Sequence, residues 1–369
     1  MGASGTRTGS RRILYCFPRR STFIQRDIEG LSSRYDVRTH ELRAQPAWKL
    51  PFRLVHQFAW LLHNRAWSCD CICHFSGYHA LLPVMLCRRT FIILAGSDCA
   101  SIPSIRYGNH ARKVLGWATR RAAASATRLL PVHPSLMRRV QTYSSAAPRE
   151  QGILAFGPWI NTPWTAIPYG FDPEQWSPGA ATERDPALFI SVPGPATPQN
   201  RLHRLKGVDM VLAIAERLPE ARFTIVGLDD PGAYHIAPGN VTLLGRVSSD
   251  GLLELYRKAS FHLQLSLSEG MPNALCEAML CGCVPVVSDV ASMPDIVEGC
   301  GAVLKRDDPG TGAEVCGTLI ALDRATWSAR SAASREKVRT AFPMRRRVDE
   351  LIRIIEDGAP AEKPTISAA

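Results

Sequence analysis

The chain has 369 residues, 46 % of them hydrophobic, and a formal net charge of +11. This length exceeds what one ordinary hydrophobic core holds, so we expect two domains. No apolar run reaches the ~18 residues that a membrane-spanning helix needs, and the apolar stretch at 13–17 is shorter than the core of a secretory signal. We therefore expect a cytoplasmic protein.

The charge is unevenly distributed along the chain. Residues 1–170 contain 23 Lys and Arg but 7 Asp and Glu, whereas the remaining residues contain 21 and 26. This asymmetry indicates an anionic partner for the first half, such as nucleic acid, an acidic lipid surface or a phosphorylated substrate. No helix-turn-helix, zinc or RNA-binding pattern accompanies the charge, so we expect no nucleic-acid partner.

The 11 cysteines are an odd number, and their spacing does not resemble a disulfide framework. Cys69, Cys71 and Cys73 alternate, which places all three on one face of a strand. Metal-binding cysteines are usually separated by turn-forming spacers of about two to four residues. We therefore interpret these three as small buried side chains and expect no metal site.

In the first half, apolar runs typical of buried strands alternate with segments of helical periodicity, which predicts a parallel α/β sheet. Short apolar runs at 127–134, 152–157 and 165–172 close this half. We expect strands at 12–17, 36–42, 69–75 and 90–98, and helices at 22–35 and 109–126.

The pattern restarts after a linker rich in Gly, Pro and polar residues at 169–185. We expect an N-terminal domain at 1–170, a second α/β domain at 171–340, and a helix at 341–358 that crosses back to the first domain. The tail at 359–369 has the composition of disorder. Within the second domain we expect strands at 185–194, 221–227, 240–245, 261–266, 284–289 and 301–305, and helices at 206–219, 250–259 and 273–282.

The segment SLSEGMPNALCEAMLCGCVPVVSD, residues 266–289, joins a predicted strand to a predicted helix through a turn. Pro272 suits the start of that helix and Gly282 its C-terminal cap. The backbone N–H groups of residues 270–275 would then form an anion site suited to a diphosphate. Glu277, one turn into the helix, is placed to bind a ribose, and Glu269 to bind the attached sugar. For one Glu taken alone, a capping acid on a solvated helix is the simpler interpretation.

These residues resemble the Glu-x7-Glu signature of the family-4 retaining glycosyltransferases, which have the GT-B fold. The resemblance continues through most of the chain, with Tyr169 replacing the family's usual Asn between the domains. Further similar segments are at 74–85, 95–98, 166–178, 201–219 and 240–261. The resemblance implies two doubly wound, Rossmann-like domains facing a cleft, with acceptor on the first and nucleotide sugar on the second.

In this family, an Arg and a Lys five positions later neutralise the donor diphosphate, where negative charge grows as the bond breaks. Arg201 and Lys206 have that spacing, although an intervening segment leaves Arg204 as a rival to Arg201. The resemblance implies that Glu269 is catalytic through contact with the transferred sugar, and that Glu277 binds the ribose. The other donor-binding residues implied are Gly270, Met271, Asn273, Ala274 and Leu275 at the phosphates, and Arg246 and Val247 at the base.

The first domain offers fewer matches. Asp98 ends an apolar strand at the expected cleft edge, where it either orients a sugar in catalysis or caps the next helix. His74 lies near another strand end and is an acceptor-binding or a structural residue. Arg20 and Ser21 stand where the family has a glycine-rich loop, and we expect them to meet a phosphate of the acceptor.

The reaction implied is metal-independent transfer, with retention, from a UDP- or GDP-linked sugar to a glycan or lipid-linked acceptor. No cofactor is implied beyond this co-substrate. The expected role is cell-envelope or exopolysaccharide synthesis. The alternatives are a non-catalytic sugar-nucleotide-binding protein and a nucleotide-sugar epimerase or a phosphorylase of the same fold.

The segment 48–67 mixes Trp, Phe and Leu with Lys and Arg. Such a segment can hold a helix at an anionic membrane surface, and many relatives use lipid-linked acceptors at the cytoplasmic leaflet. Aromatic residues at helical spacing can equally belong to a core. Contact with the inner face of the plasma membrane is therefore one of two interpretations.

Overall fold

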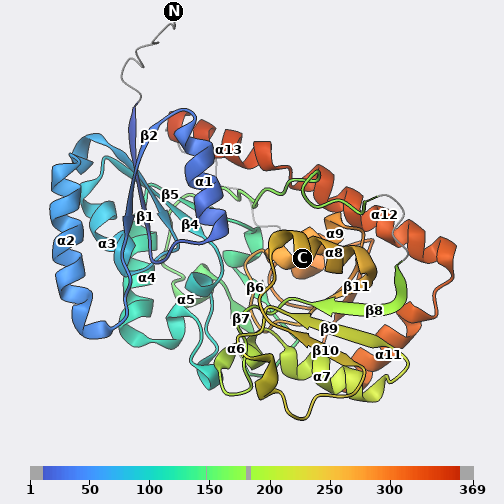
Figure 1. Cartoon of the computed structure of the whole chain (residues 1–369). Coiled ribbons are helices and arrows are strands. Elements are labelled where there is room, and N and C mark those ends of the chain that lie inside the picture. Colours follow the sequence, from blue (N-terminus) through green and yellow to red (C-terminus); the bar gives the residue numbers. More distant parts are fainter. Residues whose placement is uncertain (1–10, 147, 180–183, 358–369) are drawn as a thin grey trace, which may run out of the picture.

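The computed structural model describes residues 11–146, 148–179 and 184–357. They form two α/β domains that lie side by side, each built on a parallel sheet with helices around it (Figure 1). The two doubly wound domains confirm the predicted fold class. The predicted tail at 359–369 lies outside the described residues.

The first sheet has five parallel strands in the order β2-β1-β3-β4-β5. Its inner strands are almost wholly buried, as expected where helices cover both faces of a parallel sheet. Every residue of β3 is buried, including the cysteines at 71 and 73. The strands are β1 (Arg12–Phe17), β2 (Asp36–Glu41), β3 (Asp70–His74), β4 (Arg89–Leu94) and β5 (Arg128–Pro131).

The helices of the first domain are α1 (Thr22–Ser32), α2 (Leu50–His63), α3 (Tyr78–Leu86), α4 (Lys113–Ser125) and α5 (Ile153–Phe156). Helix α3 packs against both α2 and α4, whereas α1 packs against the last helix of the chain. A short antiparallel pair, β6 (Arg139–Val140) and β7 (Glu150–Gln151), follows β5.

The second sheet has six parallel strands in the order β10-β9-β8-β11-β12-β13. Phe189, Phe223 and Phe261 stack across three neighbouring strands, with ring centroids 4.7 and 5.3 Å apart. The strands are β8 (Asp185–Ser191), β9 (Arg222–Val226), β10 (Val241–Leu244), β11 (Ala259–Gln264), β12 (Val284–Ser288) and β13 (Ala302–Leu304).

Seven helices among the described residues belong to the second domain. The longest, α12, packs against α9 and β12. The helices are α6 (Arg201–Leu205), α7 (Val208–Arg217), α8 (Ser249–Lys258), α9 (Asn273–Leu280), α10 (Met293–Val297), α11 (Pro309–Ile320) and α12 (Arg324–Ala341).

The final helix, α13 (Met344–Asp357), lies against α1 of the first domain (Figure 1). Its Arg347 is buried and donates from Nε and Nη2 to the two carboxylate oxygens of Asp27, each at 2.6 Å. The chain enters the second domain beside the point where it leaves it, because Phe171 forms a parallel bridge with Pro343. The last helix is therefore a part of the first domain in space.

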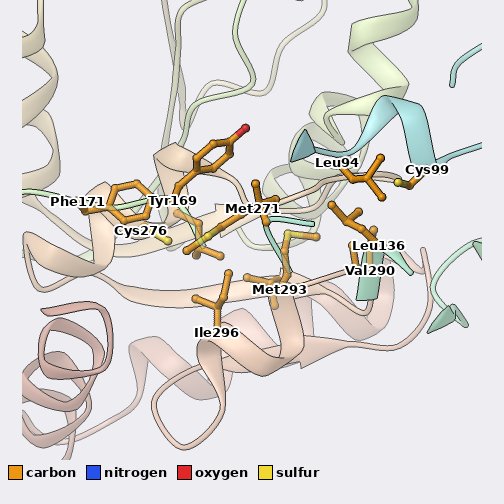
Figure 2. Packing of buried hydrophobic residues seen from close by; sticks show 14 of the residues in the cluster. Leu94, Cys99, Leu136, Tyr169, Phe171, Met271, Cys276, Val290, Met293 and Ile296 are labelled. Atoms are coloured by element: carbon orange, nitrogen blue, oxygen red, sulfur yellow. The ribbon is translucent and has the colours of Figure 1, made fainter. Parts of the chain in front are cut away.

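The buried cores of the two domains meet. Figure 2 shows Leu94, Cys99 and Leu136 of the first domain packed near Met271 and Met293 of the second. Part of the interface between the domains is therefore apolar. Across the described residues, no helix is both long and apolar enough to cross a membrane.

Candidate functional site

A cavity of about 280 Å³ lies between the domains, where strands of both sheets end. Open α/β sheets bind ligands at this edge. Its lining includes residues after β3 and β4 of the first domain and after β8 and β11 of the second. The cavity is lined by Phe23, Phe75, Ala95, Gly96, Ser97, Tyr107, Tyr169, Val192, Lys206, Gln264, Glu269, Gly270, Met271, Pro272, Asn273 and Ala274.

Lys206 and Glu269 meet in this cavity. The Nζ atom of Lys206 lies 2.6 Å from Oε1 of Glu269. The same oxygen accepts hydrogen bonds from Ser266 Oγ at 2.7 Å and Gln264 Nε2 at 3.1 Å. The carboxylate is therefore oriented by β11 and its following turn, independently of the lysine.

Gly207 explains why Lys206 can reach this point. Its φ is +71°, and a Cβ atom there would lie 2.1 Å from the carbonyl oxygen of Leu265. Only glycine allows the turn between α6 and α7 to approach the end of β11 this closely. The Lys-Gly dipeptide thus places the ammonium group beside Glu269.

The loop 270–275 carries the predicted anion site. Pro272 is the N-cap of α9, and no side chain caps this helix. The first-turn N–H groups of an α-helix have no partner within the helix, so they can bind an anion. Gly270, Met271, Asn273 and Ala274 line the cavity, whereas Leu275 is buried in the core.

The two domains are in contact at a pair of glycines that line the cavity. A Cβ atom on Gly270 would lie 2.0 Å from the carbonyl oxygen of Ala95, and one on Gly96 would lie 3.0 Å from the amide nitrogen of Gly270. Gly96 also has a φ of +136°. Both positions therefore require glycine for this approach of the two backbones.

Glu277 is not among the residues that line the cavity. Burial raises the pKa of its carboxyl group to about 7, and the Arg26 guanidinium of α1 opposes this shift. Within the described residues, no side chain or backbone group donates a hydrogen bond to this carboxyl group. Glu277 is thus a half-buried acid with free hydrogen-bonding capacity on the helix that begins at the cavity.

The structure separates the two candidate arginines. Arg201 lies beside the cavity, with its guanidinium 5.9 Å from the ring centre of Tyr107 and Nη1 3.2 Å from the carbonyl oxygen of Arg106. Arg204 lines a different hollow and faces Asp209 at 3.9 Å. Of the two, Arg201 is therefore the arginine that contacts a residue of the cavity lining.

Arg246 and Val247 follow β10 at the far edge of the second sheet. Arg246 is exposed and Val247 is half-buried. Neither lines the cavity between the domains.

Asp98 is fully buried behind the cavity. Its Oδ1 accepts hydrogen bonds from the N–H groups of Ala95 and Gly96, at 3.1 and 3.0 Å, and its Oδ2 from that of Ser76 at 2.9 Å. Burial raises the pKa of this carboxyl group to about 6, although these N–H groups act in the opposite direction. Asp98 thus fixes the loop 95–97 that lines the cavity, without lining it itself.

His74 is also buried behind the cavity. Its ring nitrogens lie 2.9 Å from the hydroxyl oxygens of Tyr15 and Tyr169. Burial and the nearby Arg347 cation lower its pKa well below the usual value. Tyr169, which replaces the family's Asn, stands between His74 and the cavity.

Arg20 and Ser21 lie at the start of α1, outside the cavity lining. Arg20 is exposed, donates to Gln25 at 2.5 Å and lies 5.4 Å from the ring centre of Phe17. Ser21 is the N-cap residue, and among the described residues its buried Oγ has no hydrogen-bond partner.

Sequence reasoning missed the aromatic residues of the cavity. Phe23 and Tyr169 lie 5.0 Å apart, Phe23 and Phe75 lie 6.2 Å apart, and Tyr107 completes the group. They come from four separate segments and share no motif. Only Tyr169 gave a signal, as a departure from the family pattern.

Residues 200–321 match the sequence model of the family described as Glycosyl transferases group 1. This match lies within the second domain, and the chain as a whole has the GT-B fold. A D-inositol 3-phosphate glycosyltransferase of Mycolicibacterium vanbaalenii is 31% identical over 151 residues, which are 35% of this chain and 34% of that protein. The aligned part thus spans about a third of that relative.

Solved structures agree on the fold. A sucrose-phosphate synthase from Thermosynechococcus elongatus superposes with a TM-score of 0.70 at 14% identity, over 94% of this chain and 98% of the other. The HepE protein of Anabaena in complex with UDP-glucose gives 0.63 at 12% identity, over 92% and 99%. At these identities the likeness establishes the architecture of both domains.

Proposed function

We propose that this protein transfers a sugar, with retention of configuration, from a UDP- or GDP-linked donor to a glycan or lipid-linked acceptor. The observation that carries the proposal is the Lys206–Glu269 pair beside the uncapped start of α9, inside an interdomain cavity. The GT-B fold, the match to the group 1 family and a same-fold neighbour that binds UDP-glucose support it.

The donor diphosphate would lie at the first turn of α9. The N–H groups of 270–275 and the ammonium group of Lys206 would neutralise it as the bond to the sugar breaks, with Arg201 at the edge of the site. Glu269 would stay oriented by Ser266 and Gln264 when Lys206 turns to the phosphates. Glu277 would bind the ribose, and Arg246 and Val247 the base.

In the transfer step, an acceptor hydroxyl attacks the anomeric carbon from the face that the diphosphate leaves. The departing phosphate oxygen takes the electron pair of the broken bond and accepts the hydroxyl proton. This route needs neither a protein nucleophile nor a metal, because backbone N–H groups and Lys206 stabilise the leaving group. Asp98 would act through the loop 95–97 that it holds.

The acceptor would lie on the first domain. A second hollow of about 210 Å³ shares Phe75 and Ser97 with the cavity and extends to Leu42 and Ala44. A relative whose name specifies an inositol phosphate supports a phosphorylated acceptor, and Arg20 and Ser21 would bind its phosphate, with His74 supporting the site from behind. A glycan or lipid carrier of cell-envelope polysaccharide synthesis fits this class.

A nucleotide-sugar panel and one variant test the proposal. We expect one UDP- or GDP-sugar to raise the unfolding temperature of the full chain, since ligand at about 100 times its Kd adds ~2.7 kcal/mol. Glu269→Gln should keep nucleotide binding but lose transfer and donor hydrolysis. Unchanged transfer in this variant would remove Glu269 from the reaction, and nucleotide binding without any turnover of the native chain would favour a binding protein.

Retention and metal independence need separate measurements. The anomeric configuration of the product, read by proton NMR, should equal that of the donor, and EDTA should leave the rate unchanged. An inverted product would overturn the proposed displacement geometry, and donor epimerised without transfer would identify an epimerase.

A further inference from the structure

Helix α2 and its flanks turn large apolar side chains toward solvent. Trp48, Phe52 and Val55 are 68%, 71% and 69% exposed. Phe58, Leu62 and Trp67 extend this row along the helix and are exposed too. The spacing 48, 52, 55, 58 and 62 places these residues on one side of the helix. We name the six residues the α2 face.

The distribution of apolar residues around α2 differs from that of an ordinary surface helix. Its buried residues are Gln57 and Leu61, and Gln57 donates to the carbonyl oxygen of His79 at 2.8 Å. A helix between a core and water normally presents apolar residues inward and polar residues outward. Here large apolar side chains also point outward, which is typical of a surface that contacts an apolar partner.

The exposed charges of the segment that contains the α2 face have one sign. From residue 42 to residue 149 the chain contains two acidic residues, Asp70 and Asp98, and both are fully buried. Lys49 lies 4.9 Å from the ring centre of Trp48. Trp48, Phe52, Lys49 and Arg53 also border an open hollow of about 420 Å³. The exposed charges of this segment are therefore cationic.

We propose that the α2 face docks on an anionic lipid bilayer. The aromatic and aliphatic side chains would enter the boundary between headgroups and acyl chains, and Lys49 and Arg65 would lie at the level of acidic headgroups. Two copies of this chain would bring the same cations together, which opposes association of the α2 faces with each other. The inference does not depend on the transfer reaction.

Docking through α2 would also orient the cleft. The hollow that adjoins the interdomain cavity reaches Leu42 and Ala44, four residues before Trp48. The start of the α2 face is thus linked by a short segment to the wall of this hollow, which is where an acceptor held in the membrane would enter in the proposed arrangement.

Vesicle co-sedimentation of the full chain tests the proposal. We expect binding to vesicles of phosphatidylcholine with phosphatidylglycerol, weaker binding at high salt, and little binding to phosphatidylcholine alone. Replacing Trp48, Phe52 and Val55 together by Ser should abolish binding and leave the unfolding temperature unchanged, because these side chains are exposed. Ile236→Ser, which removes an exposed apolar side chain from the second domain, should bind as the native chain does.

A charge-reversal pair tests the cationic part. Lys49→Glu with Arg65→Glu should weaken binding to the anionic vesicles by about tenfold or more, whereas Lys258→Glu, an exposed position on α8, should not. Equal binding by the triple Ser variant, equal binding to neutral vesicles, or no binding to anionic vesicles would overturn the proposal. So would a dimer in sedimentation equilibrium that the triple variant abolishes, because a second copy would then cover the α2 face.

Discussion

At the scale of single residues, the candidate site depends on charges that are close together and partly withdrawn from water. Glu269 carries three hydrogen-bond donors on one carboxylate oxygen, and one of them is the Lys206 ammonium. Glu277 carries none within the described residues, and its pKa is raised to about 7. The two acids of one motif therefore differ in environment: Glu269 is held by hydrogen bonds, whereas the carboxyl group of Glu277 is free to accept them.

Removing the cation at the proposed diphosphate should slow transfer. Lys206→Ala should lower kcat/KM by about 10²–10³, the usual effect of losing one stabilising group at a developing negative charge. Lys258→Ala, on an exposed position of the same domain, should leave it unchanged. Steady-state kinetics with the identified donor measure both, and a change below threefold for Lys206→Ala would contradict its role.

The raised pKa of Glu277 predicts that this residue lowers the stability of the fold at high pH. Its folded pKa, about 7, lies above the ordinary value of 4.5, so the folded state binds the proton more tightly than the unfolded state does. The carboxyl group thus costs no stability below pH 4.5 and destabilises the fold increasingly as pH rises through 7.

Glu277→Gln should therefore raise the free energy of unfolding at pH 8 by about 1–3 kcal/mol, with little effect near pH 4.5. The same change should weaken donor binding, because an amide accepts fewer hydrogen bonds from a ribose than a carboxylate does. Urea unfolding at both pH values measures the first effect. The exposed Glu220→Gln serves as the control, and equal shifts at both pH values would exclude the titration of Glu277 as the cause.

At the scale of elements, the buried pair between α13 and α1 holds the end of the chain to the first domain. Arg347 and Asp27 are each only 3% exposed and share two hydrogen bonds. Removing one partner leaves a buried charge without compensation, which usually costs about 3–5 kcal/mol.

Arg347→Met should destabilise the protein by that amount, measured by urea unfolding. Arg346→Met is the matched control, because the neighbouring Arg346 forms an exposed pair with Glu350 and should cost less than about 1 kcal/mol. Equal losses for the two variants would show that α13 is not held by the buried pair.

Sequence patterns predicted the strands and helices best where the local sequence alone indicates the secondary structure. The buried strands have nearly continuous apolar runs, and β1 lies at 12–17 as expected. The strand, turn and helix of 259–280 were readable from Pro272 and the apolar run before it. Lys206 and Glu269, 63 positions apart, were expected together only through a family resemblance.

Contacts between distant segments were not predictable from those patterns. Arg347 and Asp27 lie 320 positions apart, and neither has a neighbour that marks it as paired. The cavity aromatics Phe23, Phe75, Tyr107 and Tyr169 likewise come from separate elements. The three backbone N–H groups that donate to the buried Asp98 carboxylate are placed by loop geometry that residue types do not reveal.

At the scale of the whole molecule, the close approach of the two domains depends on glycines that face each other. Gly270→Ala would place a Cβ atom 2.0 Å from the carbonyl oxygen of Ala95, so we expect the domains to separate while each keeps its own core. Small-angle X-ray scattering should then report a larger radius of gyration, and transfer should fall by about tenfold or more, since a displacement of ~1 Å can cost 10²-fold.

Gly239→Ala is the control for this variant, because a Cβ atom there meets no atom within 4 Å. It should change neither the scattering nor the rate. If Gly270→Ala also kept the native radius and the native rate, the contact between loops 95–96 and 269–270 would have no part in assembling the site.

The parallel bridge between Phe171 and Pro343 has a mechanical consequence. Both chain connections between the two domains pass through this bridge. The simplest motion that separates the domains is therefore a rotation about the bridge. Atoms beside the pivot hardly move in such a rotation, while displacement elsewhere grows in proportion to distance. In the proposed reaction, such a rotation would open the cavity most at the end far from the bridge and leave the two chain connections nearly in place.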